Sequence, residues 1–163
     1  GDGQLSSTPA EAARPQPTAP VQPLAEGESF PEVSLLALSG ERLQLRVSGS
    51  SKPVLLFVFS PRCSICHETL PIWKELFDAA QSMSVEVMGL SVLDPARTER
   101  YAREYDLPWN VYCLDRDSIR KLRVQRVPVT WLLEGSGRLI AVMGGGLSSE
   151  RKAELIDRMR NAS

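Results

Sequence analysis

Two cysteines and a histidine lie together in this sequence. Cys63 and Cys66 are separated by two residues, and His67 follows directly. Thiols at this spacing can form a disulfide and open it again by thiol exchange. Because so short a loop constrains the unfolded chain little, the pair suits a working redox centre better than a structural crosslink. Cys63 and Cys66 are therefore the candidate catalytic residues.

The residues around this pair predict a setting in which Cys63 is reactive. Residues 54–59 are continuously apolar, which is typical of a strand buried on both faces of a sheet. After three further residues, of which Arg62 carries a positive charge, Cys63 begins a helical pattern. The first turn of a helix has unpaired N–H groups and a positive dipole end, which favour a thiolate. We therefore expect Cys63 to attack a disulfide and Cys66, one turn later and more buried, to resolve the mixed disulfide.

Three other interpretations of the cysteines are open. A zinc site usually has four ligands, and only Cys113 and His67 could complete such a set. Residues 63–67, Cys-Ser-Ile-Cys-His, also match the attachment signature of a c-type haem, although strand patterns rather than helices frame them. The two cysteines could also be incidental at a helix start. Of these, we favour the redox interpretation, with no metal and no cofactor.

Length and composition limit the remaining classes. The chain has 163 residues, 42% of them hydrophobic, and a formal net charge of −1. This length fits one domain, and the near-neutral charge gives no electrostatic reason to expect a nucleic-acid partner. The longest aliphatic and aromatic run, residues 54–59, is far shorter than the ~20 residues of a membrane-spanning helix. The sequence therefore predicts a soluble globular domain.

Residues 1–27 differ in composition from the rest. Five prolines lie between Pro9 and Pro23, and the segment has no aromatic residue. Such a segment cannot bury enough apolar surface to offset the entropy of ordering it. We predict a disordered, Pro-rich spacer over 1–27 and a folded domain over 28–163. The spacer either has no task or follows a removed signal peptide or membrane anchor.

The rest of the chain alternates strand and helix patterns. Apolar alternation predicts a hairpin within 36–47, and further strands are predicted at 85–90, 111–114, 129–133 and 139–143. Helices are predicted from Ile65, after Asp94, over 118–122 and after Ser148. The order predicts an α/β fold with a central mixed sheet flanked by helices on both faces.

The same patterns predict the burial and the helix geometry of several single residues. Ile65 falls on the apolar stripe of the first helix and Ala153 on that of the last, while Pro71 should kink the first. We expect Trp73 and Trp131 in the core, and Trp109 either there or at the surface.

Four polar or reactive side chains near these elements have two interpretations each. His67 is expected on the helix surface, with tuning of a thiol as the alternative. Cys113 is expected in the core, with a relay of the disulfide as the alternative. Arg123 and Arg126 are expected in a solvated loop, with attraction of acidic partners as the alternative.

Two separated segments carry a resemblance to a known family. The strand, the Cys63–Cys66 motif and a helix containing Pro71 resemble the active-site segment of the thioredoxin superfamily. A second mark is Val127-Pro128-Val129-Thr130, before the last strand pair. The resemblance implies a thioredoxin-like three-layer sandwich with an N-terminal β-hairpin and a central insert. It also implies a cis Val127–Pro128 bond beside Cys63, with Val127 and Pro128 binding an extended substrate.

The spacing narrows the resemblance to one branch. An insert near 85–105 resembles TlpA-like and redoxin-type domains, and residues 59–66 are similar to the MauD-like branch. This implies a thiol-disulfide oxidoreductase that reduces, oxidises or isomerises protein disulfides with a redox partner protein. It further implies a monomer outside the cytoplasm, periplasmic or membrane-anchored and facing outward.

The chain also departs from that pattern at residues that handle protons. Phe57 stands where thioredoxin has a buried Asp, and Thr69 stands where TlpA-like reductases often have Glu. The carboxylate that usually takes the proton of the buried thiol is therefore missing, and the direction of electron flow is open. A peroxide-reducing redoxin of the AhpC/TSA type is an alternative, although Ser60 replaces its usual Thr. A c-type haem electron carrier is a further alternative.

Overall fold

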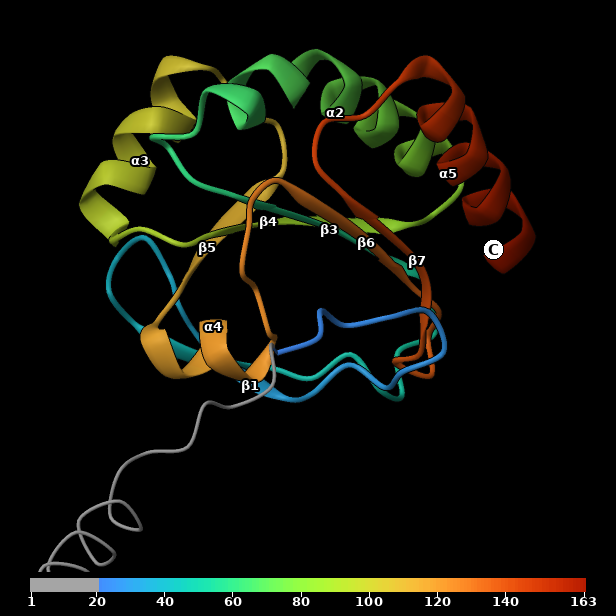
Figure 1. Ribbon diagram of the computed structural model, residues 1–163, viewed down its shortest axis with the longest axis horizontal. Helices are drawn as coiled ribbons and strands as arrows, with labels where there is room; N and C mark the ends of the chain where they lie inside the picture. The colour runs from blue at the N-terminus through green and yellow to red at the C-terminus, as the bar shows by residue number, and fades with distance from the viewer. Residues whose placement is uncertain (1–20) are drawn as a thin grey trace, which may run out of the picture.

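The computed structural model describes residues 21–163, which form one mixed seven-stranded sheet between two layers (Figure 1). The strand order is β2-β1-β5-β4-β3-β6-β7. The central strands β3, β4 and β5 pair in parallel, and the outer strands pair antiparallel. The strands are β1 Val33–Leu36, β2 Arg42–Leu45, β3 Val54–Phe59, β4 Glu86–Ser91, β5 Asn110–Leu114, β6 Val129–Leu133 and β7 Leu139–Gly144. The predicted α/β class and mixed sheet are confirmed.

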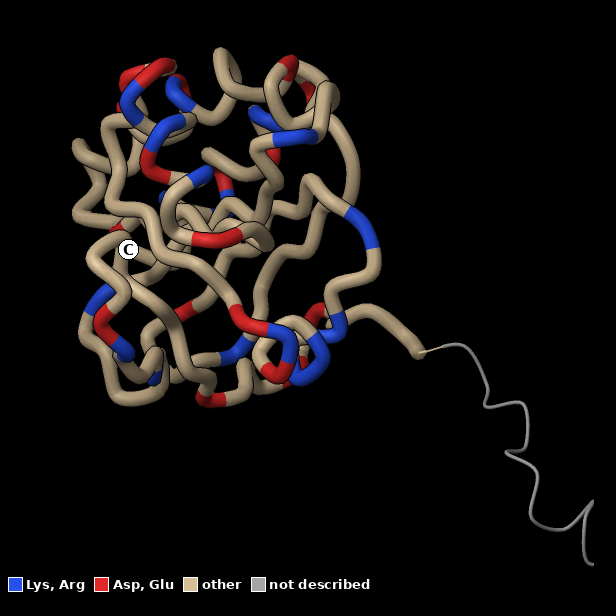
Figure 2. The backbone as a smooth tube through the Cα atoms, turned by 90° about the vertical axis from the view of Figure 1, so that its left-hand side faces the viewer, with Lys and Arg blue, Asp and Glu red and all other residues tan. Residues whose placement is uncertain are grey.

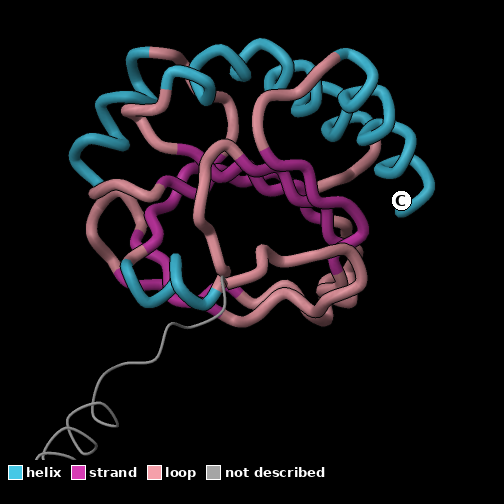
Figure 3. Tube along the Cα trace, viewed as in Figure 1, coloured by secondary structure: helices cyan, strands magenta, loops and turns pink. Residues whose placement is uncertain are grey.

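Helices cover the two faces of the sheet unequally. The helices are α2 Ser64–Ser82, α3 Pro95–Glu104, α4 Arg116–Lys121 and α5 Ser149–Ala162. In Figure 1, α2, α3 and α5 lie on one face and the short α4 on the other. Figure 3 shows that loops form most of the layer on the α4 side. The long helix that begins at the cysteine pair therefore belongs to the well-covered face.

Local sequence explains where these helices begin. The side chains at the four N-caps each accept a hydrogen bond from a backbone N–H of the first turn, which satisfies a donor that the helix leaves unpaired. These residues are Cys63, Asp94, Asp115 and Ser148. Pro71 lies within α2 and does not end it. The Cys63–Cys66 motif therefore lies at the N-terminal end of a 19-residue helix.

Strand β3 separates two apolar cores, because all six of its residues are buried. On the α2 side, the Phe57 ring stacks on Trp73 at a centroid distance of 4.7 Å and meets the edge of Trp109 at 4.9 Å. On the other side, Trp131 packs edge-on against Phe30 at 5.3 Å. Trp73 and Trp131 are in the core as predicted, and Trp109 also proves buried.

Three sequence expectations are wrong, the first at the domain boundary. Residues 24–27 were assigned to the spacer, yet Leu24 is only 4% exposed and Gly27 donates a backbone hydrogen bond to Leu139 at 2.8 Å. Composition identified a Pro-rich segment but not the tertiary contact that ends it. The rest of the predicted spacer, 1–20, lies outside the described residues.

The other two errors concern helix faces. Ile65 is 50% exposed, because the buried face of α2 runs through Cys66, and a neighbouring residue lies about 100° away around the helix. Ala153 is exposed for a similar reason, since Leu155 and Met159 form the buried face of α5. Both helices exist as predicted, and Trp73 and Met159 lie on their buried faces, but Ile65 and Ala153 lie outside those faces.

The surface carries both charge signs. Figure 2 shows Lys and Arg interspersed with Asp and Glu along the chain, in keeping with the net charge of −1. Within residues 21–163, no helix is long and apolar enough to cross a membrane.

Candidate active site

Cys63 lies at the N-terminal end of α2 with its sulfur turned toward two backbone groups. The backbone N–H of Cys66 donates to Cys63 Sγ at 3.1 Å. On its other side, Cys63 Sγ lies 3.7 Å from the backbone oxygen of Val127. The side chain is half-buried, so a substrate sulfur can approach it. A donor N–H at the positive end of a helix supports negative charge on this sulfur.

The loop before Cys63 is held by its own hydrogen bonds. The N–H of Cys63 donates to the backbone oxygen of Ser60 at 3.0 Å, and the N–H of Arg62 donates to Ser60 Oγ at 3.1 Å. Ser60 is 8% exposed. Because the turn is fixed at both residues, Cys63 has a defined position at the end of β3.

Cys66 lies one helical turn into α2 and is fully buried. Burial raises the pKa of the Cys66 thiol to about 12, and the adjacent Cys63 thiol acts in the same direction. Both cysteines are free thiols in this structure. The predicted contrast between an accessible Cys63 and a buried Cys66 is therefore present. A thioether bond from Cys66 to a haem would require opening the first turn of α2.

The two positions that could supply a proton-accepting carboxylate do not do so. Phe57 is buried between aromatic rings, and the Thr69 hydroxyl donates to the backbone oxygen of Ile65 at 2.7 Å. Among the described residues, Cys63 is the side chain that, after burial, raises the pKa of Cys66 most.

Residues 127 and 128 lie beside the cysteine pair, although they are more than 60 positions away in sequence. The Val127–Pro128 peptide bond is cis. An open groove of about 690 Å³ runs along this segment, and its apolar lining includes Ile65, Trp131 and Val142. Pro23 and Leu24 also line the groove. The groove thus connects the surface beside the CxxC motif with the N-terminal segment.

The basic residues of this loop differ in their partners. Arg123 forms an ion pair with Glu28, while Arg126 is exposed at the groove. The groove lining includes these two arginines and no acidic residue.

His67 and Cys113 take the positions expected of them. His67 is exposed, with its ring 4.5 Å from that of Tyr105. Cys113 is 1% exposed in β5, and burial raises the pKa of its thiol. Within the described part of the chain, no group of three or more His, Cys, Asp or Glu residues is placed to hold a metal ion.

Two residues that the sequence analysis did not connect with the site lie next to it. Ile65 is exposed between the two cysteines, and only the rotation of α2 shows this. Tyr101 is buried, and its hydroxyl has no hydrogen-bond partner. Tyr101 and Tyr105 are four residues apart, a spacing that places them on one helix face, but a sequence pattern gives no sign of an unpaired hydroxyl.

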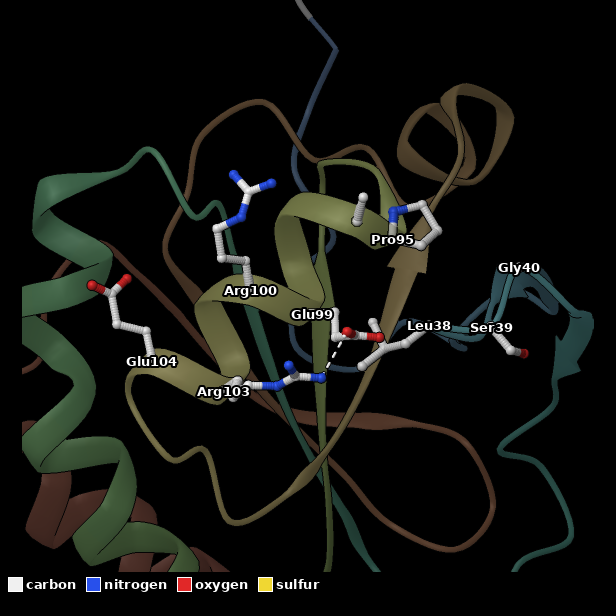
Figure 4. A pocket seen from close by; sticks show the side chains of 9 residues that line it. Leu38, Ser39, Gly40, Pro95, Glu99, Arg100, Arg103 and Glu104 are labelled. Atoms are coloured by element: carbon white, nitrogen blue, oxygen red, sulfur yellow. Dashed lines mark hydrogen bonds and ion pairs between the residues drawn. The ribbon is translucent and has the colours of Figure 1, made fainter.

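A second cavity lies away from these residues. It is formed by the β1–β2 turn and one face of α3, with Leu38, Pro95 and Glu99 among its lining residues (Figure 4). Two of its charged residues, Arg103 and Glu99, form an ion pair at 3.0 Å. It contains no cysteine or histidine.

Known proteins share this sequence pattern and fold. Thioredoxin-like protein YneN of Bacillus subtilis is 24% identical over 136 residues, which cover 81% of this chain and 79% of that protein. Methylamine utilization protein MauD of Methylophilus methylotrophus is 25% identical over 116 residues, 71% of this chain but only 54% of MauD. The thioredoxin domain of thiol-disulfide oxidoreductase BVU-2223 from Bacteroides vulgatus superposes with a TM-score of 0.70 at 20% identity, covering 85% of this chain and 99% of that domain.

The structural likeness establishes a thioredoxin-like fold. The model of the AhpC/TSA family matches residues 27–142, which is most of the chain. The chain therefore belongs to the AhpC/TSA family, within the thioredoxin superfamily.

Proposed function

We propose that this protein is a thiol-disulfide oxidoreductase in which Cys63 is the nucleophile and Cys66 the resolving thiol. The observation that carries the proposal is the position of Cys63 Sγ. It accepts the Cys66 N–H at 3.1 Å at a helix N-terminus and lies half-exposed beside Val127. An accessible sulfur supported by a backbone donor is a suitable attacking group.

Reduction of a substrate proceeds in two exchanges. Cys63 Sγ attacks one sulfur of the substrate disulfide, forming a mixed disulfide while the other sulfur leaves as a thiolate and takes up a proton. Cys66 then loses its proton and attacks Cys63 Sγ, so that the Cys63–Cys66 disulfide forms and the second substrate sulfur leaves. Two electrons pass from the cysteine pair to the substrate. The reverse sequence oxidises a substrate dithiol.

Protein disulfides are the substrate class that the groove supports. An extended chain lying along Val127 and Pro128 would bring its sulfur to Cys63, because Cys63 Sγ is 3.7 Å from the backbone oxygen of Val127. The apolar lining and the exposed Ile65 offer contact area for side chains next to that sulfur. A redox partner protein would restore the cysteine pair after each turnover.

The Pro-rich composition of residues 1–27 supports a further proposal about location. Such a segment acts as a spacer, and we place the domain outside the cytoplasm, as a monomer that is periplasmic or held at a membrane facing outward. The division into a spacer and a domain over 28–163 belongs to the same proposal, except that 24–27 pack on the domain.

Two serine variants test the mechanism. We expect Cys63→Ser to abolish reduction of a disulfide-bonded protein substrate. Cys66→Ser should instead trap a mixed disulfide between Cys63 and the substrate, visible on a non-reducing gel. Full activity of Cys63→Ser would refute the proposed mechanism, and activity of Cys66→Ser at the wild-type rate would refute the resolving role of Cys66.

Reduction of peroxides is the second candidate, because the family model that matches is that of AhpC/TSA. In that case Cys63 Sγ would attack one peroxide oxygen, the O–O bond would break, and the other oxygen would leave as an alcohol or water. Cys66 would then attack the resulting sulfenic acid on Cys63, forming the disulfide and releasing water. The backbone oxygen of Ser60 accepts a hydrogen bond from the Cys63 N–H, but the Ser60 Oγ already accepts from the Arg62 N–H. Peroxide consumption by the reduced protein, measured without partner proteins, separates the candidates. Failure to consume peroxide removes this one.

A further inference from the structure

The resolving step requires a negative charge on a sulfur that the fold buries. Cys66 is 0% exposed, and neither Phe57 nor Thr69 offers a proton acceptor. Cys66 nevertheless has to become a thiolate before it can attack the mixed disulfide on Cys63. Charge in an apolar site needs a compensating donor. A donor close to Cys66 would therefore serve this step.

The Tyr101 hydroxyl is an unused donor in the same core. Tyr101 is 6% exposed, and its Oη is fully buried without a hydrogen-bond partner. Unpaired buried hydroxyls destabilise the folded state, so each one in a native structure requires an explanation. Thr69 on α2 and Thr98 on α3 are also buried hydroxyls on this face of the sheet, and both have partners.

Packing places Tyr101 beneath the cysteine loop. Its ring lies 5.6 Å from that of Phe59, the last residue of β3 before that loop, and 4.7 Å from that of Tyr105. Tyr101 and Cys66 belong to one apolar core, and Cys63 packs against it.

The titratable groups that act on the Tyr101 hydroxyl come from the start of α2, with Cys63 and Cys66, and from the end of α3, with Glu104 and Tyr105. Burial raises the pKa of Tyr101 most, and negative charge on Cys66 raises it next. The hydroxyl therefore keeps its proton and can act only as a neutral donor or acceptor.

We propose that the Tyr101 hydroxyl donates a hydrogen bond to the Cys66 thiolate when that charge forms, directly or through one water. The proposal rests on the proposed resolving role of Cys66. In the dithiol state the hydroxyl bonds neither sulfur, so the bond is made only in the charged state and favours the step that creates it. Tyr101 acts through Cys66, not on the substrate, and is in that sense a positioning residue.

Tyr101→Phe tests the proposal because it removes one oxygen and keeps the ring. The reduced protein is mixed in a stopped-flow instrument with the aromatic disulfide 5,5′-dithiobis(2-nitrobenzoate), whose thiol product is coloured. Attack by Cys63 releases the first equivalent, and attack by Cys66 on the mixed disulfide releases the second. We expect Tyr101→Phe to leave the first rate unchanged and to slow the second about tenfold. The pH profile of the second phase should shift upward by about one unit.

Tyr105→Phe is the matched control, since Tyr105 is half-buried at the C-cap of the same helix, and it should alter neither phase. Thermal unfolding of Tyr101→Phe should show no loss of stability, because the oxygen removed has no partner in the dithiol state. An unchanged second phase would overturn the proposal, as would equal slowing of both phases, which indicates a merely structural role. Absence of a second phase from the wild-type protein would instead refute the resolving role of Cys66 on which the proposal depends.

Discussion

A buried hydrogen bond between Trp73 and Thr130 ties the cysteine helix to the strand that follows the cis peptide bond. Trp73 Nε1 donates to Thr130 Oγ1 at 3.0 Å, and both residues are at most 2% exposed. Trp73 lies on α2 with the cysteines, and Thr130 comes two residues after Pro128. The bond therefore connects the two segments that place Val127 beside Cys63, and its removal tests how the site is held.

The magnitude follows from what each substitution leaves behind. Thr130→Val keeps the shape but leaves the indole N–H unpaired, and it should lower the free energy of unfolding by about 1–3 kcal/mol. Trp73→Phe leaves the Thr130 hydroxyl unpaired and also creates a cavity, for a loss of about 2–4 kcal/mol. The double variant leaves neither group unpaired. Its loss should fall below the sum of the single losses by about 1–2 kcal/mol.

Urea unfolding of the reduced protein, with a thiol present throughout, measures these energies for the four proteins. The slope with urea should stay constant, so that midpoint shifts report stability. Additivity within about 0.5 kcal/mol would show that the two side chains do not interact energetically, and it would refute the reasoning. Reduction rates should decline in both single variants. A variant that loses stability but keeps the wild-type rate would show that the bond does not position the site.

Three further predictions follow from the same structure. Leu24→Ala should lower the free energy of unfolding by about 2–3 kcal/mol in thermal or urea unfolding. The control Val21→Ala, at a 53% exposed position, should change it by less than about 0.5 kcal/mol. Equal effects of the two variants would contradict the packing of this segment. The pKa of the Cys66 thiol is raised in the folded state from about 9 to about 12. The contribution of this thiol to the stability of the reduced protein is therefore present below pH 9 and is lost as the pH rises toward 12. Cys66→Ser should flatten the curve of stability against pH in this range. Ile65→Asp, at an exposed position, should leave thermal stability nearly unchanged but slow reduction of a protein disulfide more than that of a small aromatic disulfide, and equal slowing would exclude a role in protein binding.

Local sequence determined those features that depend on local physics. The strand of residues 54–59 was predicted at its observed bounds, because six consecutive apolar residues in a strand leave water only when both faces of the sheet are covered. The N-caps Asp94 and Ser148 were predicted for a similar reason, since an oxygen at that position satisfies a first-turn N–H. The Cys63–Cys66 motif could also be identified from the sequence without any tertiary contact.

Features that depend on tertiary contacts were missed or misplaced. Leu24 belongs to a segment whose composition is typical of disorder, yet its side chain packs in the apolar core on the Trp131 side of the sheet. The rotation of α2 decides whether Cys66 or Ile65 faces the core, and a pattern with several apolar residues at three- to five-residue spacing does not fix that angle. The unpaired state of the Tyr101 hydroxyl has no sequence signature, because it depends on every group that surrounds the atom.

The difference between the two thiols arises within a single helical turn. Cys63 is the N-cap of α2, so its sulfur faces both a first-turn N–H and the solvent. Cys66 lies three residues later, on the side of the helix that faces the core. Any chain that places two cysteines at this spacing at a helix start obtains the same contrast. What differs between such chains is the support for charge on the second thiol. Here Phe57 and Thr69 carry no carboxylate, so in the proposed mechanism the support for charge on Cys66 comes from neutral groups around it.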